Sequence, residues 1–233
     1  MMLKKLILVI TMSLLMAVPA FASAAPKTVV QVAGSSQKEI SPDIARISLS
    51  VQSIDANLDK VKNDHTSIVN RVLDSLKAQG VTQEQIKTNT YQVNPVYTYE
   101  KNRLPVLKGY RVTESLEIST SLEKVGLLVN EVTNAGANEI NSIRFETTNE
   151  TESKNEALQD AVRDAVRKAE VIAAALNKKV VRVSQVNESG VFYQPVQLDQ
   201  MRFKVASTNE AAPNIPEGKV TVSANVQVTV ELE

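Results

Sequence analysis

Few side chains in this sequence have the chemistry of an active site. His65 is the only histidine, and it lies one helical turn from both Val61 and Val69, on or beside an apolar stripe. We therefore expect it to pack against the core. A metal site would need two or three further ligands, and the sequence has no cysteine, no His-x-x-x-His pair and no EF-hand spacing. No Gly-x-Ser-x-Gly turn is present to display a serine nucleophile. The sequence thus predicts a protein that is not an enzyme, with no catalytic, cofactor-binding or metal-binding residues.

One enzymatic alternative remains, in which carboxylates such as Asp43 or Glu114 perform acid–base chemistry. It requires two carboxyl groups that face each other across a cleft. The order of residues alone does not bring two such groups together.

Tyrosines at alternating positions form the clearest candidate surface. Tyr91, Tyr97 and Tyr99 share one face of a predicted strand, because residues two apart point to the same side, and Tyr110 follows across a predicted hairpin. One interpretation is a core face or a ladder of cross-strand pairs. The other is a surface that contacts a ligand or another subunit, for which tyrosine is well suited.

The first residues have the pattern of a secretory signal peptide. Lys4 and Lys5 precede an apolar run over residues 6–16, and small residues follow, with cleavage expected near Ala22 or Ala24. Eleven residues rise only ~16 Å as a helix, against a hydrocarbon core of ~30 Å, so we expect no stable membrane anchor. The prediction is a signal peptide over residues 1–24 and an exported domain over residues 25–233, in the periplasm or otherwise outside the cytoplasm.

The net charge gives no reason to expect nucleic acid as a partner. Of 26 basic residues, Lys4 and Lys5 fall in the signal peptide, which leaves 24 against 26 acidic residues. Such a balance lacks the positive charge that phosphate backbones attract. Residues 108–112 begin like an RNA-recognition signature, but Arg111 and Val112 depart from it.

Hydrophobic periodicity predicts alternating strands and helices. We expect helices over residues 58–80, 122–136 and 149–176, and strands over residues 28–32, 45–51, 86–99, 109–120, 143–145 and 180–186. Strands that are apolar on one face only indicate antiparallel sheets with the three main helices packed on one face, an α+β fold. Two similar helix-to-strand joints, residues 77–81 and 133–137, suggest a duplicated strand–helix–strand unit. The third helix has an alanine-rich inner face that would let it approach a sheet or another helix closely.

The last part of the chain contrasts an irregular segment with a long strand. Residues 189–218 contain three prolines and are predicted to be an irregular arm or loop. Residues 219–232 alternate strictly between apolar and polar side chains from Val220 onward. Thirteen residues at ~3.3 Å each would span ~43 Å, about twice the usual strand. We expect so long a strand to pair with more than one neighbour, in its own or another subunit, and hence to build a homo-oligomer.

These landmarks, taken in order, resemble the SIMPL-domain family, also known as the YggE-like or 26 kDa periplasmic immunogenic protein group. The segments that carry the resemblance are residues 32–34, 41–45, 78–81, 86–88, Tyr91, Pro95, Tyr97, residues 109–110, 135–137 and 143–145, the alanine-rich helix and residues 215–218. The resemblance implies an exported α+β protein that self-associates, with members linked to oxidative-stress defence and no established catalytic residues.

Together these expectations describe a non-enzymatic envelope protein, either a self-assembling scaffold or a binding protein. Any link to oxidative stress would be indirect, because the chain has no thiol and four of its five methionines lie within residues 1–16. The alternative is a small-molecule binding module that uses the tyrosine-rich strand surface formed by Tyr91, Tyr97, Tyr99 and Tyr110 for an unidentified ligand.

Overall fold

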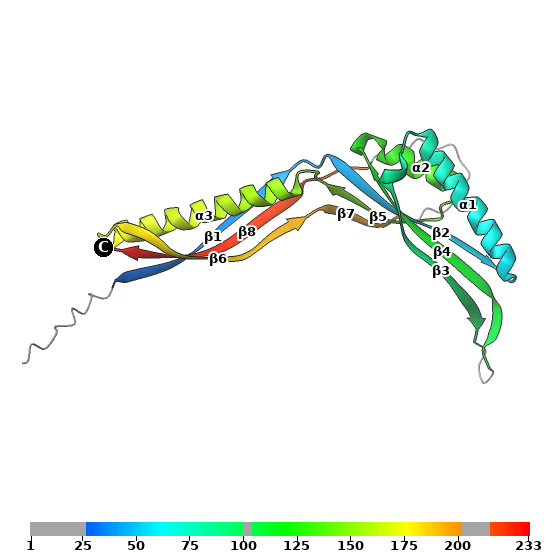
Figure 1. Ribbon diagram of the computed structural model, residues 1–233, viewed down its shortest axis with the longest axis horizontal. Helices are drawn as coiled ribbons and strands as arrows, with labels where there is room; N and C mark the ends of the chain where they lie inside the picture. The colour runs from blue at the N-terminus through cyan, green and yellow to red at the C-terminus, as the bar shows by residue number, and fades with distance from the viewer. Residues whose placement is uncertain (1–26, 100–103, 202–214) are drawn as a thin grey trace, which may run out of the picture.

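The protein is an elongated α+β molecule with two antiparallel sheets. A computed structural model describes residues 27–99, 104–201 and 215–233, and the predicted signal peptide, residues 1–24, lies outside them. A three-stranded sheet with one long helix forms one arm, and a five-stranded sheet with two helices forms the other (Figure 1). The predicted fold class is confirmed.

The elements follow one another along the chain in an order that returns to the first sheet at the end. They are β1 (Thr28–Ile40), β2 (Ile44–Asp55), α1 (Leu58–Ala78), η1 (Gln83–Gln85), β3 (Ile86–Thr98), β4 (Val106–Thr120), η2 (Leu122–Lys124), α2 (Val125–Ala135), β5 (Glu139–Glu146), α3 (Glu150–Ala175), β6 (Val180–Gln194), β7 (Val196–Met201) and β8 (Val220–Leu232).

The three-stranded sheet has the order β1–β8–β6, with β8 antiparallel to both neighbours. Its inner face is made of the apolar positions of β8, which are all buried. Helix α3 packs on this face through a single row of buried alanines: Ala157, Ala161, Ala165, Ala169 and Ala173. Because these side chains are small, the helix backbone lies close to the sheet. The alanine-rich face was therefore predicted correctly, and its partner is a sheet.

The five-stranded sheet has the order β3–β4–β2–β5–β7. Alternate residues of β2, from Ala45 to Val51, point into a core that α1 and α2 cover. Helix α1 starts at a side-chain cap, because Asn57 Oδ1 accepts a hydrogen bond of 3.0 Å from the backbone N–H of Lys60. It ends before Gly80, whose φ of 79° is readily adopted only without a side chain.

Two connections carry the chain from one sheet directly into the other. β1 passes into β2 through Ser41-Pro42-Asp43, and β6 passes into β7 at Pro195, which lacks the N–H that a continuing ladder needs (Figure 1). Asp43 also fixes the approach to α3, since its carboxylate accepts hydrogen bonds from the backbone N–H and the hydroxyl of Thr148 at 2.8 and 2.7 Å.

The prediction of an irregular segment from residue 189 onward was wrong for its first part. β6 continues to Gln194, paired with β8, and β7 follows on the edge of the second sheet. The register of β6 shifts three times against β8, so its apolar residues do not alternate as in a regular strand. Residues 202–214 of the predicted arm lie outside the described residues.

The long terminal strand is present as predicted, with 13 residues. It pairs with two neighbours, and both belong to the same chain. Both edges of β8 are therefore already hydrogen-bonded, and its backbone is not open to a strand from another subunit.

Among the residues that the structure describes, none of the helices is both long enough and apolar enough to span a lipid bilayer.

Candidate functional site

The four predicted tyrosines lie on the hairpin formed by β3 and β4. Tyr91 is opposite Glu114, and Pro95 is opposite Tyr110. Glu114 lies between the buried Val112 and Leu116 on the same face of β4, so its partner Tyr91 is on the face that the helices cover. That all four tyrosines share one face stays a prediction, because the register of β3 against β4 shifts between Val96 and Tyr97, and Tyr99 lies beyond β3.

The tyrosines are exposed, which contradicts their interpretation as a core face. The exposed fractions are 53% for Tyr91, 45% for Tyr97 and 75% for Tyr99, while Tyr110 is half-buried. Their role as a ligand or subunit surface stays a prediction.

The exposure of Tyr97 and Tyr99 arises because the hairpin extends beyond the end of β2 and the start of α1. β2 ends at Asp55, opposite Tyr110, and α1 begins three residues later and runs back over the sheet. The turn between them passes so close to β4 that a Cβ atom on Gly109 would lie 2.4 Å from the carbonyl oxygen of Asp55. Beyond this point the hairpin projects away from α1 (Figure 1).

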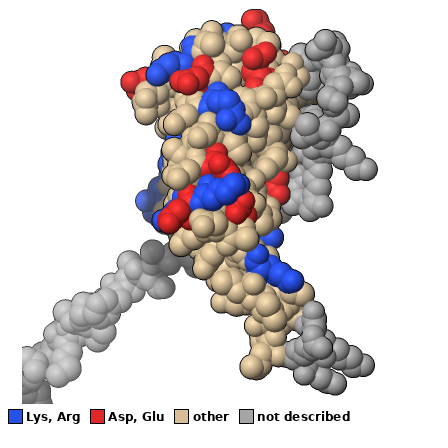
Figure 2. All heavy atoms as spheres, turned by 90° about the vertical axis from the view of Figure 1, so that its right-hand side faces the viewer, with Lys and Arg blue, Asp and Glu red and all other residues tan. Residues whose placement is uncertain are grey.

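The projecting end carries a group of apolar side chains, which we call the hairpin tip surface. Its described members are Tyr97, Tyr99, Leu104, Val106 and Leu107, each at least 44% exposed. Tyr97 lies opposite Leu107 in the ladder, so residues from both strands contribute. Figure 2 shows the projecting hairpin as largely uncharged, below a body that carries charges of both signs. Exposed apolar side chains gathered on one projecting segment in this way are typical of an interaction site.

A polar cluster lies at the base of the hairpin, around the buried imidazole of His65. The Nδ1 atom of His65 is 3.2 Å from Ser53 Oγ, and its Nε2 atom is 3.5 Å from Glu114 Oε2. The ring of Tyr91 meets the imidazole edge-on, with ring centroids 6.0 Å apart. His65 is only 1% exposed, as the prediction of a packing role requires.

The environment of His65 favours its neutral form. Burial lowers the pKa of His65 because a charged ring would lose its hydration, and the nearby carboxylate of Glu114 opposes this effect only in part. Nε2 has no hydrogen-bond partner among the described residues. Glu114 is itself 3.4 Å from the hydroxyl of Thr88.

Sequence reasoning missed Ser53 and Glu114 as neighbours of His65. A signal was present, because each is a polar residue at a position where the alternation of its strand predicts a side chain that points into the core. Ser53 follows the inward positions up to Val51, and Glu114 lies between Val112 and Leu116. Polar residues at such positions have to meet a partner in the core, and the partner is the only histidine.

The fold and this hairpin can be compared with known proteins. Residues 30–230 match the family described as SIMPL, protein of unknown function (DUF541). The matched range includes both sheets, all three main helices and the hairpin. This chain belongs to the SIMPL family.

Relatives of similar length support this assignment. The 26 kDa periplasmic immunogenic protein of Brucella melitensis is 27% identical over 226 residues, which cover 92% of this chain and 90% of the relative. The uncharacterized protein YggE of Escherichia coli K12 is 23% identical over 205 residues, covering 88% of this chain and 83% of the relative. YggE of Edwardsiella ictaluri is 23% identical over 184 residues, with coverages of 78% and 77%.

In this SIMPL protein the two carboxylates considered for acid–base chemistry do not form a pair. Asp43 precedes β2 and is hydrogen-bonded to Thr148. Glu114, in β4, is paired with Val51 near the other end of β2 and contacts His65. Among the described residues, no group of three or more His, Cys, Asp or Glu side chains is arranged to hold a metal ion.

The residue types around His65 are those of a hydrolytic triad, but their placement differs from one. The imidazole is 1% exposed on the inner face of α1, so a substrate could reach it only if the helix moved away from the sheet. In addition, the serine contacts Nδ1 while the carboxylate lies near Nε2, the reverse of the usual arrangement. The cluster is better suited to fixing the hairpin against α1 than to catalysis.

Proposed function

We propose that this SIMPL protein is an exported, non-enzymatic envelope protein that acts by self-association, with the hairpin tip surface as the contact between copies. The observation that carries the proposal is the exposure of Tyr97, Tyr99, Leu104, Val106 and Leu107 on a hairpin that projects from the body. Export is supported by the signal-peptide pattern of residues 1–24 and by a relative whose name describes it as periplasmic.

The chemistry of the hairpin tip surface suits a protein partner. Tyrosine combines a large apolar ring with a hydroxyl that remains hydrogen-bonded, and it is enriched in interfaces between proteins. β3 is also an edge strand of its sheet, paired only with β4 among the described strands. Its outer edge can accept a strand from a second copy, which would add backbone hydrogen bonds to the apolar contact.

The terminal strand β8 does not support the proposal in the way the sequence suggested. Its edges are occupied by β1 and β6, and α3 covers its apolar face. Self-association is therefore assigned to the opposite arm of the molecule, where the hairpin leaves both an apolar surface and a strand edge uncovered.

The test is the mass of residues 25–233 in solution, measured by light scattering and sedimentation at micromolar concentration. We expect an oligomer for the natural chain and a monomer for the Tyr97→Asp/Leu107→Asp variant. Val181→Asp is the matched control, because Val181 is an exposed valine (52%) on the other arm, in β6. A natural chain that is strictly monomeric, or an oligomer that dissociates only with Val181→Asp, would overturn the proposal.

A second candidate function is binding of a small molecule on the tyrosine-bearing face. The observation in its favour is that Tyr91 is half exposed while its ring contacts the buried His65, so a ligand stacked there would also lie near Glu114. A thermal-shift screen of envelope metabolites should then give shifts that disappear in Tyr97→Ala and Tyr91→Ala. Shifts that persist in both variants would argue against this function.

We further propose that any role in oxidative-stress defence is indirect. The chain has no cysteine, and Met201 is its only methionine beyond residue 16. Beyond residue 16 the chain therefore offers a single sulfur atom for reversible oxidation, the usual chemistry of protein scavengers.

A further inference from the structure

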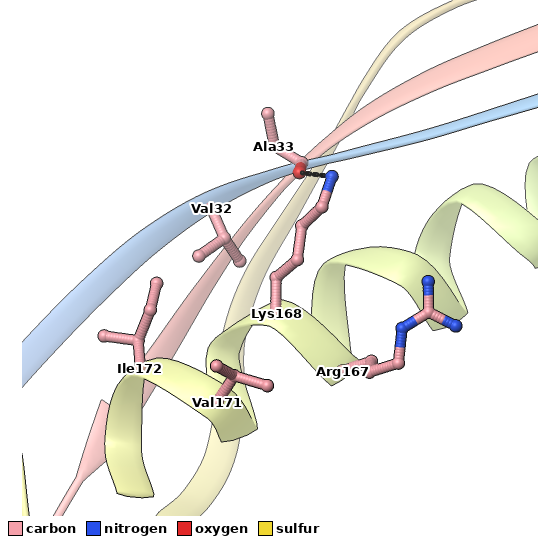
Figure 3. Close-up of a pocket in the computed structure, with 6 residues that line it drawn as sticks. All are labelled: Val32, Ala33, Arg167, Lys168, Val171 and Ile172. Atoms are coloured by element: carbon pink, nitrogen blue, oxygen red, sulfur yellow. Dashed lines mark hydrogen bonds between the residues drawn. The ribbon is translucent and has the colours of Figure 1, made fainter. Parts of the chain in front are cut away.

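The three-stranded arm contains a depression that the proposed self-association does not use. It lies between α3 and the edge strand β1, has a volume of about 350 Å³, and is lined by Val32, Ala33, Arg167, Lys168, Val171 and Ile172 (Figure 3). Its volume falls at the lower end of the range of ~300–1,000 Å³ that is typical of ligand sites.

The floor of this depression is apolar, with Val32 itself only 7% exposed and the helix residues beside it accessible. Val32 points inward from β1, while Val171 and Ile172 of α3 are 66% and 36% exposed. Leu176, one turn further along the helix, is 53% exposed. From Lys168 to Ile172 the helix rises ~6 Å, and Leu176 follows directly after its last residue, which gives an apolar strip along the helix.

Two cations lie at one end of the strip and share a single carboxylate. Lys168 Nζ is 2.6 Å from Asp164 Oδ2, and Arg167 is 2.6 Å from Asp164 Oδ1. Lys168 also donates to the carbonyl oxygen of Ala33 at 3.1 Å, as Figure 3 shows. The side chains of Arg167 and Lys168 remain 73% and 47% exposed. The three side chains together carry one net positive charge, and both cations retain donors that can face solvent.

Asp164 keeps this cation pair in place rather than neutralising it. The hydrogen bonds from Lys168 and from the backbone N–H of Ser35 lower the pKa of Asp164 to about 2, so the carboxylate is ionised at any pH near neutral. It thereby holds both cationic side chains at the rim of the apolar strip.

We propose that this depression binds a free single-chain anionic amphiphile, whose head group joins Arg167 and Lys168 and whose hydrocarbon tail lies along Val32, Val171 and Ile172. Charge complementarity assigns the sign of the head group, since the cations of the site outnumber its one acid. The apolar strip favours a single flexible chain, because its apolar side chains follow one another along α3 beside β1.

The probes that test this inference are decanoate and decyltrimethylammonium, which have tails of the same length and opposite charge, together with butyrate, which has the head group and almost no tail. Binding to residues 25–233 is measured by calorimetry and by methyl NMR signals of Val171 and Ile172. We expect decanoate to bind, to shift those methyl signals, and to bind at least about tenfold more tightly than the other two compounds, a difference of ~1.4 kcal/mol. Equal binding of the cationic probe, or of butyrate, would overturn the inference.

Substitutions separate the two halves of the site. Val171→Asp should weaken decanoate binding by about tenfold or more, because a buried methylene contributes ~0.8 kcal/mol and the tail contacts several apolar groups. The Arg167→Gln/Lys168→Gln pair should weaken it by a similar factor, because it removes the positive charge that attracts the carboxylate head group. Arg163→Gln is the matched charge control, since Arg163 makes the equivalent contact with Asp160 one turn earlier on the same helix and is 72% exposed. Loss of binding with Arg163→Gln, or retention with Val171→Asp, would contradict the assignment.

Two further measurements distinguish this inference from its alternatives. The Tyr97→Asp/Leu107→Asp variant should bind decanoate normally, since the hairpin lies on the other arm of the molecule (Figure 1). Co-sedimentation with phosphatidylglycerol vesicles should be absent. Vesicle binding without binding of decanoate would show that a membrane surface, not a free amphiphile, occupies the site.

Discussion

Gly34 of β1 lies directly against the backbone of α3 at Ala161. A Cβ atom at position 34 would be 2.1 Å from the carbonyl oxygen of Ala161 and 2.7 Å from the Cβ of Ala165. The neighbouring atoms belong to the helix backbone and to the shortest of side chains, so neither can move aside without moving the helix. This contact sets the distance between the helix and the three-stranded sheet.

The change Gly34→Ala should therefore destabilise the protein by about 1–3 kcal/mol, the usual cost of overpacking a core. Urea denaturation followed by circular dichroism gives the free energy of unfolding. Ser35→Ala is the adjacent control, because the side chain of Ser35 is exposed and its backbone N–H, which donates to Asp164, is retained. Equal stability of the two variants would show that α3 is not held at this distance.

The same contact illustrates how far the sequence predicts the fold. Alanines at every fourth position predict a helix that approaches a neighbour closely, and strict alternation predicts β8, because both patterns are local. The structure of the segment that starts at residue 189 could not be predicted from local patterns in the same way. Gly190 and Pro195 indicate a turn, yet pairing with β8 keeps β6 extended as far as Gln194. The shifts of register in β6 also remove the period that would have revealed it.

The candidate site was predictable to a similar degree. Parity predicts that Tyr91, Tyr97 and Tyr99 share one face, and the structure places all three on or directly next to β3. The exposure of Tyr97 and Tyr99 depends on where β2 ends and α1 begins relative to the hairpin, which is a long-range relationship. The contact of His65 with Glu114 joins residues 49 positions apart in the sequence. The inward positions of Ser53 and Glu114 indicate that each needs a polar partner, but they do not identify His65 as that partner.

His65 should make stability depend on pH below the ordinary histidine value. The pKa of His65 is lowered in the folded protein, so the unfolded chain binds the proton more tightly, and protonation favours unfolding. Stability should therefore fall as the pH drops below the ordinary histidine value of ~6.5, and this loss should level off once the pH is below the pKa of folded His65. The ionisable groups that face the ring are Glu114 on β4 and Tyr91 on β3.

The measurement is the change in unfolding free energy between pH 7.5 and pH 5.5 for the natural chain and for His65→Gln. The natural chain should lose more stability over this interval than the variant does. Comparing differences rather than absolute values removes the general cost of the substitution. A variant that retains the full pH dependence would assign it to other groups.

The side chain of Asn138 forms the two hydrogen bonds with the backbone of β2 that a neighbouring strand would form. Its Nδ2 donates to the carbonyl oxygen of Gln52 at 2.7 Å, and its Oδ1 accepts from the N–H of Gln52 at 3.0 Å. Asn138→Ala removes both bonds and should cost about 1–2 kcal/mol, since a net hydrogen bond is worth ~1 kcal/mol. The amide proton of Gln52 should exchange faster with solvent, measured by NMR.

Asn138→Asp is the informative companion variant. It keeps the oxygen that accepts from the N–H of Gln52 and loses the donor to its carbonyl group. Protection of the Gln52 amide should then be largely retained in Asn138→Asp, although stability decreases. If exchange accelerates equally in both variants, the side chain does not pair with the strand as described.

Glu231, in β8, forms ion pairs with Lys27, which precedes β1, and with Arg182 in β6. Its carboxylate lies 2.9 Å from Nε of Arg182 and 2.8 Å from Nζ of Lys27. These two contacts, with Arg182 the larger, lower the pKa of Glu231 to about 2. Because the folded value lies below the unfolded one, the carboxylate stabilises the fold above the ordinary value of ~4.3, and this contribution is lost as the pH falls towards 2.

An NMR titration of the Glu231 carboxyl carbon tests the contacts directly. Arg182→Gln should raise the pKa of Glu231 towards its ordinary value by more than Lys27→Gln does, because Arg182 is the stronger cause. Salt should raise it as well, because both cations are 60% exposed and an exposed ion pair weakens as the ionic strength rises. A titration that neither substitution shifts would mean that the carboxylate is free in solution, and β6 would then be joined to β8 by its backbone pairing alone.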